Sequence, residues 1–204
     1  RRRGQDQRCP GMTIVHVATE LSGGAGGFVR HLHLAMQGMG LPSLVLTRER
    51  NELGGVGTLK PITRIKGSLR ARSLTALGKV GLLDSSYAMF GIEKCPVSAA
   101  DIQHAVTHIK PSAFVFYWTS YFVDFETMLA LRRACPHVPI VLTCTDEAFL
   151  TGGCHYAHGC EGYLRSCSEC PATTIAVLQR RISQRFVQRR ALIDEIDPVV
   201  IYPT

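Results

Sequence analysis

The stretch "TIVHVATELSGGAGGFVRHLHLAMQG", residues 13–38, joins three patterns that together indicate the fold. It begins with a short apolar run, residues 13–18, that has the length and composition of a buried β-strand. Four glycines in five residues follow, and apolar residues then recur at helical spacing. We expect a strand, a glycine loop that can approach a ligand closely, and a helix that starts near Gly27.

The rest of the chain repeats this alternation. Further apolar runs predict strands at 43–47, 113–118, 139–144 and 198–203, and helical spacing predicts helices over 98–109, 124–134 and 175–194. Continuous apolar strands separated by helices are typical of a parallel sheet that is covered on both faces. We therefore predict a Rossmann-like α/β fold with a doubly wound parallel sheet. Residues 48–97 show no firm period, and we expect a mobile excursion there.

The composition fits one large domain, or a domain and a half, of a soluble protein. The chain has 204 residues, of which 46% are hydrophobic and 19% charged, so it can bury a sizeable core. Its apolar runs are far shorter than the roughly 20 residues needed to span a bilayer. We predict a cytoplasmic location, a flexible extension over residues 1–11 and a natural start at Met12.

The formal charge of +7 is concentrated in two stretches. The first holds six basic residues and no acidic one: Lys60, Arg64, Lys66, Arg70, Arg72 and Lys79. The second consists of Arg180, Arg181, Arg185, Arg189 and Arg190. Such stretches suit an anionic partner, including peripheral contact with the inner face of the cytoplasmic membrane, or they form a solvated basic face. The first stretch has no aromatic residue for base stacking, and we predict no nucleic-acid partner.

The glycine-rich sequence "GGAGGFV" excludes two common phosphate-binding motifs. It lacks the Gly-Lys-Ser/Thr ending of a Walker loop, and its glycines do not match the G-x-G-x-x-G pattern. The start of the following helix still offers backbone N–H groups to an anion. A tight turn with a purely structural purpose remains the alternative.

Two longer segments carry a resemblance to a known family. Residues 12–47, "MTIVHVATELSGGAGGFVRHLHLAMQGMGLPSLVLT", resemble the opening of the retaining glycosyltransferases of family four, which are two-domain GT-B enzymes. Residues 138–171, "VPIVLTCTDEAFLTGGCHYAHGCEGYLRSCSECP", are similar to the T-G-G-C-H-Y…C…C-x-x-C-P segment of a subgroup that builds bacterial cell-surface polysaccharides, including colanic-acid-type transferases. "VVIYPT", residues 199–204, takes the place of the V-V-x-P-S sequence before the interdomain linker in that family.

The resemblance implies that residues 12–204 form the N-terminal, acceptor-side half of a GT-B enzyme, with the C-terminal donor domain absent from this chain. The implied reaction transfers a sugar, with retention, from a nucleotide-sugar donor to a glycan or a lipid-linked acceptor. The family's glycine loop lies near the donor diphosphate, and that role carries over to Gly23, Gly24, Ala25 and Gly26. The alternative is a truncated or degenerate relative that binds a glycan or an anion without transferring sugar.

Two departures from the family pattern affect the predicted site. The chain reads Phe116-Tyr117-Trp118 where the family has L-H-W, and Thr143-Cys144-Thr145-Asp146 where it has T-L-H-D. Histidines are thus replaced by Tyr117 and Thr145, which together with Trp118 are the candidate substrate-binding residues. Asp146 is the candidate catalytic residue. For Trp118 the alternative is core packing, and for Asp146 it is capping of the next turn.

Residues 151–171 form a cysteine-rich loop. Cys154, Cys160, Cys167 and Cys170 follow the spacing C-x5-C-x6-C-x2-C. Four thiolates close together in a cytosolic protein favour a structural zinc site. Reduced or disulfide-paired structural cysteines, and a redox or iron–sulfur role, remain alternatives.

Overall fold

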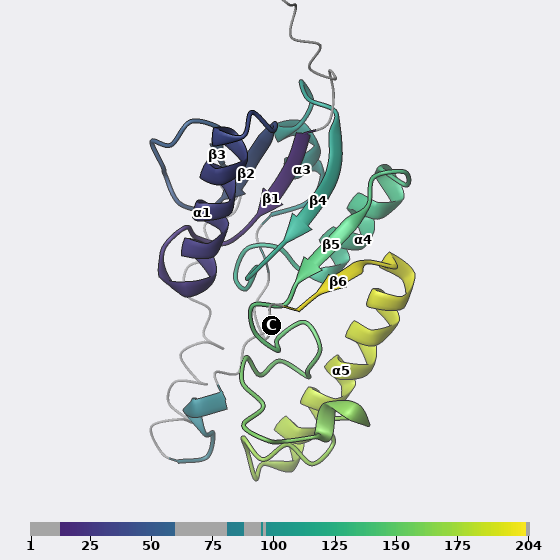
Figure 1. Ribbon diagram of the computed structural model, residues 1–204. Coiled ribbons are helices and arrows are strands. Elements are labelled where there is room, and N and C mark those ends of the chain that lie inside the picture. The colour runs from purple at the N-terminus through teal and green to yellow at the C-terminus, as the bar shows by residue number, and fades with distance from the viewer. Residues whose placement is uncertain (1–12, 60–80, 88–94, 96, 203–204) are drawn as a thin grey trace, which may run out of the picture.

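The computed structural model describes residues 13–59, 81–87, 95 and 97–202. Its centre is a six-stranded sheet in which every paired strand is parallel, with the order β3-β2-β1-β4-β5-β6 (Figure 1). The strands are β1 (Thr13–Val17), β2 (Ser43–Thr47), β3 (Val56–Thr58), β4 (Pro111–Phe116), β5 (Ile140–Thr143) and β6 (Val199–Ile201). This order confirms the predicted Rossmann-like parallel sheet.

Helices cover both faces of the sheet. The α-helices are α1 (Gly23–Gly38), α3 (Ala99–Ala105), α4 (Phe125–Ala134) and α5 (Ala176–Ile196), and η1 (Ser85–Tyr87) and η2 (Gly162–Leu164) are short 3-10 helices. On one face α1 packs over the first half of the sheet, whereas α3, α4 and α5 lie on the other (Figure 1). The chain is therefore doubly wound in the described residues, as the alternating pattern predicts.

The core follows from the alternation of side chains along each strand. Val15 and Val17 of β1 point into the large cluster beneath α3, α4 and α5, where they meet Phe114 and Phe116 of β4. The intervening positions face α1, whose Val29 belongs to a smaller cluster. The central strands β1, β2, β4 and β5 are mostly apolar because helices cover both faces there, whereas β6 at one edge is exposed.

Two elements differ from the sequence expectation. Helix α1 begins at Gly23 and not near Gly27, so the glycines form the first turns of the helix and not a loop before it. Gly26 needs its missing side chain, because a Cβ atom there would lie 2.6 Å from the carbonyl oxygen of Glu20. The second difference lies in residues 48–97, where no element was expected but the three-residue strand β3 and the short helix η1 are present.

Several expectations concern residues outside the described ranges. These are the extension over residues 1–11, the start at Met12 and the first basic stretch, Lys60 to Lys79. Within the described ranges, no helix combines the length and the apolar character needed to cross a lipid bilayer.

Candidate functional site

The order of the strands defines where a ligand should bind. The connection after β1 passes to one face of the sheet and the connection after β4 passes to the other, so a crevice opens between the carboxyl ends of these two strands. In open α/β sheets this switch point is the usual ligand site. A cavity of about 610 Å³ lies there, which we call the glycine cleft.

The glycine cleft brings together residues from three separate strand ends. The residues that were predicted and line it are Gly23, Gly24, Ala25, Gly26, Trp118, Thr145 and Asp146. The residues that sequence reasoning missed are Glu20, Ser22, Phe28, His155 and Tyr156. The predicted positions meet because parallel strands end at the same edge of a sheet.

The first turn of α1 forms one wall of the cleft. Its N-cap residue, Ser22, makes no side-chain hydrogen bond to the helix, and the first turn holds no acidic residue. A Cβ atom at Gly24 would meet nothing within 4 Å, so the space beside this residue is open. The helix start can therefore present N–H groups and a partial positive charge to a bound anion.

Asp146 and His155 form the polar centre of the cleft. His155 Nδ1 lies 2.5 Å from Asp146 Oδ2, and only 4% of the histidine side chain and 13% of the aspartate side chain are exposed. Asp146 Oδ1 also accepts a hydrogen bond from the N–H of Ala148 at 2.9 Å. The Asp146 carboxylate thus caps the following turn and also lines the glycine cleft, and its catalytic role stays a prediction.

The carboxylate also orients the imidazole. Because the carboxylate of Asp146 can only accept, Nδ1–H of His155 donates to it, and in the uncharged imidazole Nε2 is then the acceptor. Ser120 Oγ lies 3.3 Å from this nitrogen. A histidine held in this way can accept a proton or a hydrogen bond from a hydroxyl group.

His155 was missed because it follows β5 only at the far end of a turn. The turn is closed by hydrogen bonds from the N–H of Glu147 to the carbonyl oxygen of His155 at 3.0 Å, and from the N–H of Ala157 to the carboxylate of Glu147. In the sequence, the one signal for His155 is its position next to Cys154 in the cysteine-rich loop. That signal points to a metal ligand as readily as to a site residue.

Aromatic side chains give the cleft a second recognition feature. Phe28 is 47% exposed and Tyr156 is 55% exposed, and both line the cleft with Trp118. The Trp118 ring meets the His155 ring edge-on, with the centroids 6.2 Å apart. Flat apolar faces beside the carboxylates of Glu20 and Asp146 suit a sugar, whose ring stacks while its hydroxyls donate hydrogen bonds.

Tyr117, a candidate substrate-binding residue, lies outside the glycine cleft but borders the pocket that adjoins it. It is 1% exposed, and its hydroxyl shares a 2.8 Å hydrogen bond with His16 Nδ1. Burial raises the pKa of the Tyr117 hydroxyl. Side chains alternate along the chain, so Tyr117 points beneath α1 while Trp118 points into the cleft.

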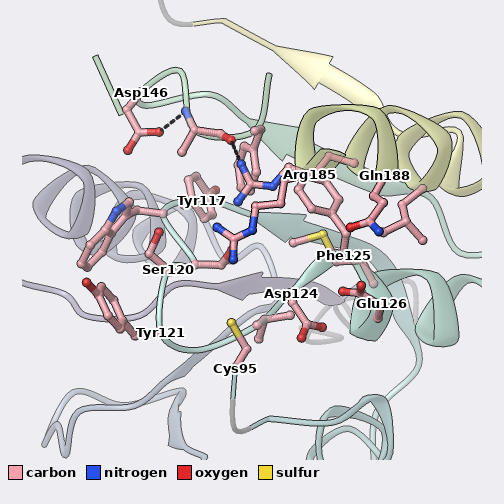
Figure 2. A pocket seen from close by; sticks show the side chains of 18 residues that line it. Cys95, Tyr117, Ser120, Tyr121, Asp124, Phe125, Glu126, Asp146, Arg185 and Gln188 are labelled. Carbon is pink, nitrogen blue, oxygen red and sulfur yellow. Dashed lines mark hydrogen bonds between the residues drawn. The ribbon is translucent and has the colours of Figure 1, made fainter. Parts of the chain in front are cut away.

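A second pocket, of about 340 Å³, adjoins the cleft and shares Trp118 and Asp146 with it. Figure 2 shows Asp124 and Glu126 on its α4 side, with Arg185 and Gln188 reaching it from α5. A groove with hydrogen-bonding groups of both charges can extend the binding surface beyond the cleft.

One member of the second basic stretch has a structural role. Arg189 Nη1 donates to the carbonyl oxygens of Ala148 at 2.8 Å and Thr151 at 3.1 Å. Its guanidinium group also lies over the Phe125 ring, 5.8 Å from the centroid. Arg189 therefore links α5 to the turn that contains Asp146. It is not part of a solvated basic face.

The four cysteines of the loop border one small cavity of about 20 Å³. Burial raises the pKa of the Cys167 thiol to about 11, and it also raises the pKa values of Cys154 and Cys170. No disulfide joins the cysteines of the described ranges. As they stand, no three His, Cys, Asp or Glu side chains of those ranges are arranged to hold a metal ion. The zinc site stays a prediction at this point.

Comparisons with known proteins add no assignment. No protein-family model matches this chain, and no curated protein or solved structure matches it.

Proposed function

We propose that this chain is the acceptor-side half of a GT-B glycosyltransferase that takes part in cell-surface polysaccharide synthesis. The observation that carries the proposal is the glycine cleft, in which a helix N-terminus, aromatic side chains and a histidine–carboxylate pair meet at the switch point of a Rossmann-like sheet. The resemblance over residues 12–47 and 138–171 supports the same function.

Each group of the cleft suits a different part of the proposed donor and acceptor. The start of α1 suits the diphosphate of a nucleotide sugar, because its N–H groups and dipole stabilise negative charge as the diphosphate departs. Trp118, Phe28 and Tyr156 suit the faces of sugar rings. Asp146 and the Nε2 atom of His155 suit hydroxyl groups of the acceptor.

The proposal places the remaining donor-binding groups in a second domain. The acceptor would be a glycan or a lipid-linked saccharide at the inner face of the cytoplasmic membrane. The first basic stretch would supply the membrane contact, and its residues lie outside the described ranges.

The direct test is saturation-transfer NMR on the 204-residue chain with a panel of nucleoside-diphosphate sugars and their free nucleotides. We expect a dissociation constant of about 1 mM or weaker, or about −4 kcal/mol, because the proposal assigns most donor-binding groups to a second domain. Trp118→Ala should abolish the sugar signals. Val187→Ala is the matched control, because Val187 is exposed on α5 and lines neither the cleft nor the adjoining pocket.

Two outcomes would change the assignment. Micromolar binding of a nucleotide sugar by this chain alone would contradict the acceptor-half proposal. Binding of oligosaccharides with no contact to any nucleotide sugar would favour the alternative, a non-catalytic glycan-binding module.

A further inference from the structure

We propose that Cys154, Cys160, Cys167 and Cys170 bind one zinc ion, and that this ion holds the turn that presents His155 to Asp146. The first part rests on the gathering of the four thiols and the second on the hydrogen bonds that connect them to the cleft. Neither part depends on sugar transfer.

The cavity between the thiols has the size of a single ion. Its volume is about 20 Å³, whereas one water molecule needs roughly 10–15 Å³ of such space. Apart from the thiols, its walls are mainly aromatic and aliphatic side chains from Tyr87, Ala157, Tyr163 and Ile182, and Glu169 is the one acidic residue that lines it. The four sulfurs are therefore the principal ligands that the cavity offers, and sulfur-rich sites select zinc.

The backbone around the thiols is already arranged by local hydrogen bonds. The N–H of Gly162 donates to Cys160 Sγ at 3.4 Å, and the N–H of Cys167 donates to the carbonyl oxygen of Gly162 at 2.9 Å. Cys167 has a φ of 51°, in the left-handed region that non-glycine residues rarely adopt. Each thiol turns about one side-chain torsion, so binding of an ion would require the four thiols to adopt rotamers that point into the cavity they border.

The loop has little else to hold it in place. Between Thr151 and Pro171 its regular structure is limited to the three-residue helix η2. Its apolar contact with α5 is a small cluster in which Cys167 and Cys170 are themselves members, beside Ile182 and Phe186. Segments with so small a core usually need a metal or disulfides to fold, and no disulfide is present in the described residues.

The thiol cluster and the cleft are directly connected. Cys154 precedes His155 in the chain, and its carbonyl oxygen accepts a 2.7 Å hydrogen bond from Thr151 Oγ1. The N–H of His155 donates to the carbonyl oxygen of Tyr87, which also lines the thiol cavity. An ion bound to Cys154 would therefore limit the movement of His155.

Metal content tests the first part. The full chain, purified under reducing conditions after growth with added zinc, should contain one zinc per molecule by mass spectrometry of the elements. Cys154→Ser and Cys167→Ser should lose most of this zinc, whereas Cys135→Ser, a cysteine outside the loop, should keep it. Exchange of zinc for Co²⁺ should give the intense absorption of thiolate-bound cobalt, and this measurement needs no variant to fold.

Hydrogen exchange tests the second part. Removal of zinc from the wild-type chain by a chelator should speed exchange of the Glu147 and His155 amides at least tenfold, while the β4 amides stay protected. Three results would overturn the site: no zinc in the wild-type chain, iron in its place, or a mass that shows disulfides among the four cysteines. Unchanged exchange at Glu147 and His155 after zinc removal would overturn the link to the cleft.

Discussion

His155 Nδ1 lies 2.5 Å from Asp146 Oδ2, although the two residues are nine positions apart and no regular element joins them. The pair stands at the carboxyl end of β5, where it faces the first turn of α1 across the glycine cleft. A fixed pair of this kind sets the tautomer of the imidazole before any ligand arrives. The tautomer of His155 can therefore be measured directly in the chain without a ligand.

Asp146→Asn should destabilise the chain by about 1–3 kcal/mol, because a buried hydrogen bond to a charged group is lost. The asparagine oxygen can still accept from Ala148, but its amide then faces the Nδ1–H of His155, and the ring should change its tautomer. Urea denaturation and ¹⁵N NMR of the histidine side chains measure the two effects. Asp194→Asn, on the exposed side of α5, is the control; an unchanged tautomer in Asp146→Asn would disprove the assigned hydrogen bond.

The glycines of α1 allow a matched pair of substitutions. Gly24→Val should leave the fold intact, because the space beside Gly24 is open, but should weaken nucleotide-sugar binding by blocking close approach. Gly26→Ala should instead destabilise the chain by roughly 1–3 kcal/mol, because its Cβ atom would lie 2.6 Å from the Glu20 carbonyl oxygen. Urea denaturation and saturation-transfer NMR separate the two outcomes. Equal sugar binding by Gly24→Val and the wild type would remove the helix start from the site.

His16 should make the stability of the chain depend on pH. Burial, and to a lesser extent repulsion from His33, lowers the pKa of His16 from 6.5 to about 4. Between pH 6.5 and about 4, His16 is therefore protonated in the unfolded chain but uncharged in the folded chain. The stabilisation is present in full above pH 6.5 and is lost as the pH falls through 4, with a total loss of about 3 kcal/mol.

A double variant checks the origin of this pH dependence. His16→Phe with Tyr117→Phe removes both partners of one buried hydrogen bond, which costs little when apolar groups of similar shape replace them. The contribution of His16 to the pH dependence should vanish, whereas Tyr117→Phe alone should retain it. Urea denaturation across the pH range measures both. A double variant with the same pH dependence as the wild type would assign the effect to another group.

The first basic stretch should bind anionic lipid. We expect the chain to sediment with vesicles that contain phosphatidylserine, and the bound fraction to fall as salt is added, because exposed charges are screened over about 10 Å at 0.1 M salt. Exchange of Lys60, Lys66 and Lys79 for glutamate should abolish the binding, whereas exchange of Arg180 and Arg181 on α5 should have a smaller effect. Binding that does not respond to salt would argue against the membrane contact.

The sequence by itself determined the class of fold and the edge of the sheet where the site lies. Apolar runs of strand length that alternate with helical spacing require a parallel sheet covered on both faces, and residues that follow such strands collect at one edge. Gly23, Trp118, Thr145 and Asp146 follow three of these strands and line one cleft, although the family resemblance, and not periodicity, singled them out. The fold class could be predicted because hydrophobic periodicity is a local property of the sequence.

Only the tertiary structure decided which side chains face one another. Tyr117 and His16 are 101 residues apart, and their hydrogen bond exists because β1 and β4 are neighbours in the sheet and both side chains point beneath α1. His155 reaches Asp146 through a turn without periodic structure, and the four thiols border one cavity because the loop folds back on α5. Such contacts depend on the packing of segments that are distant in sequence, so they cannot be predicted from local hydrophobic periodicity.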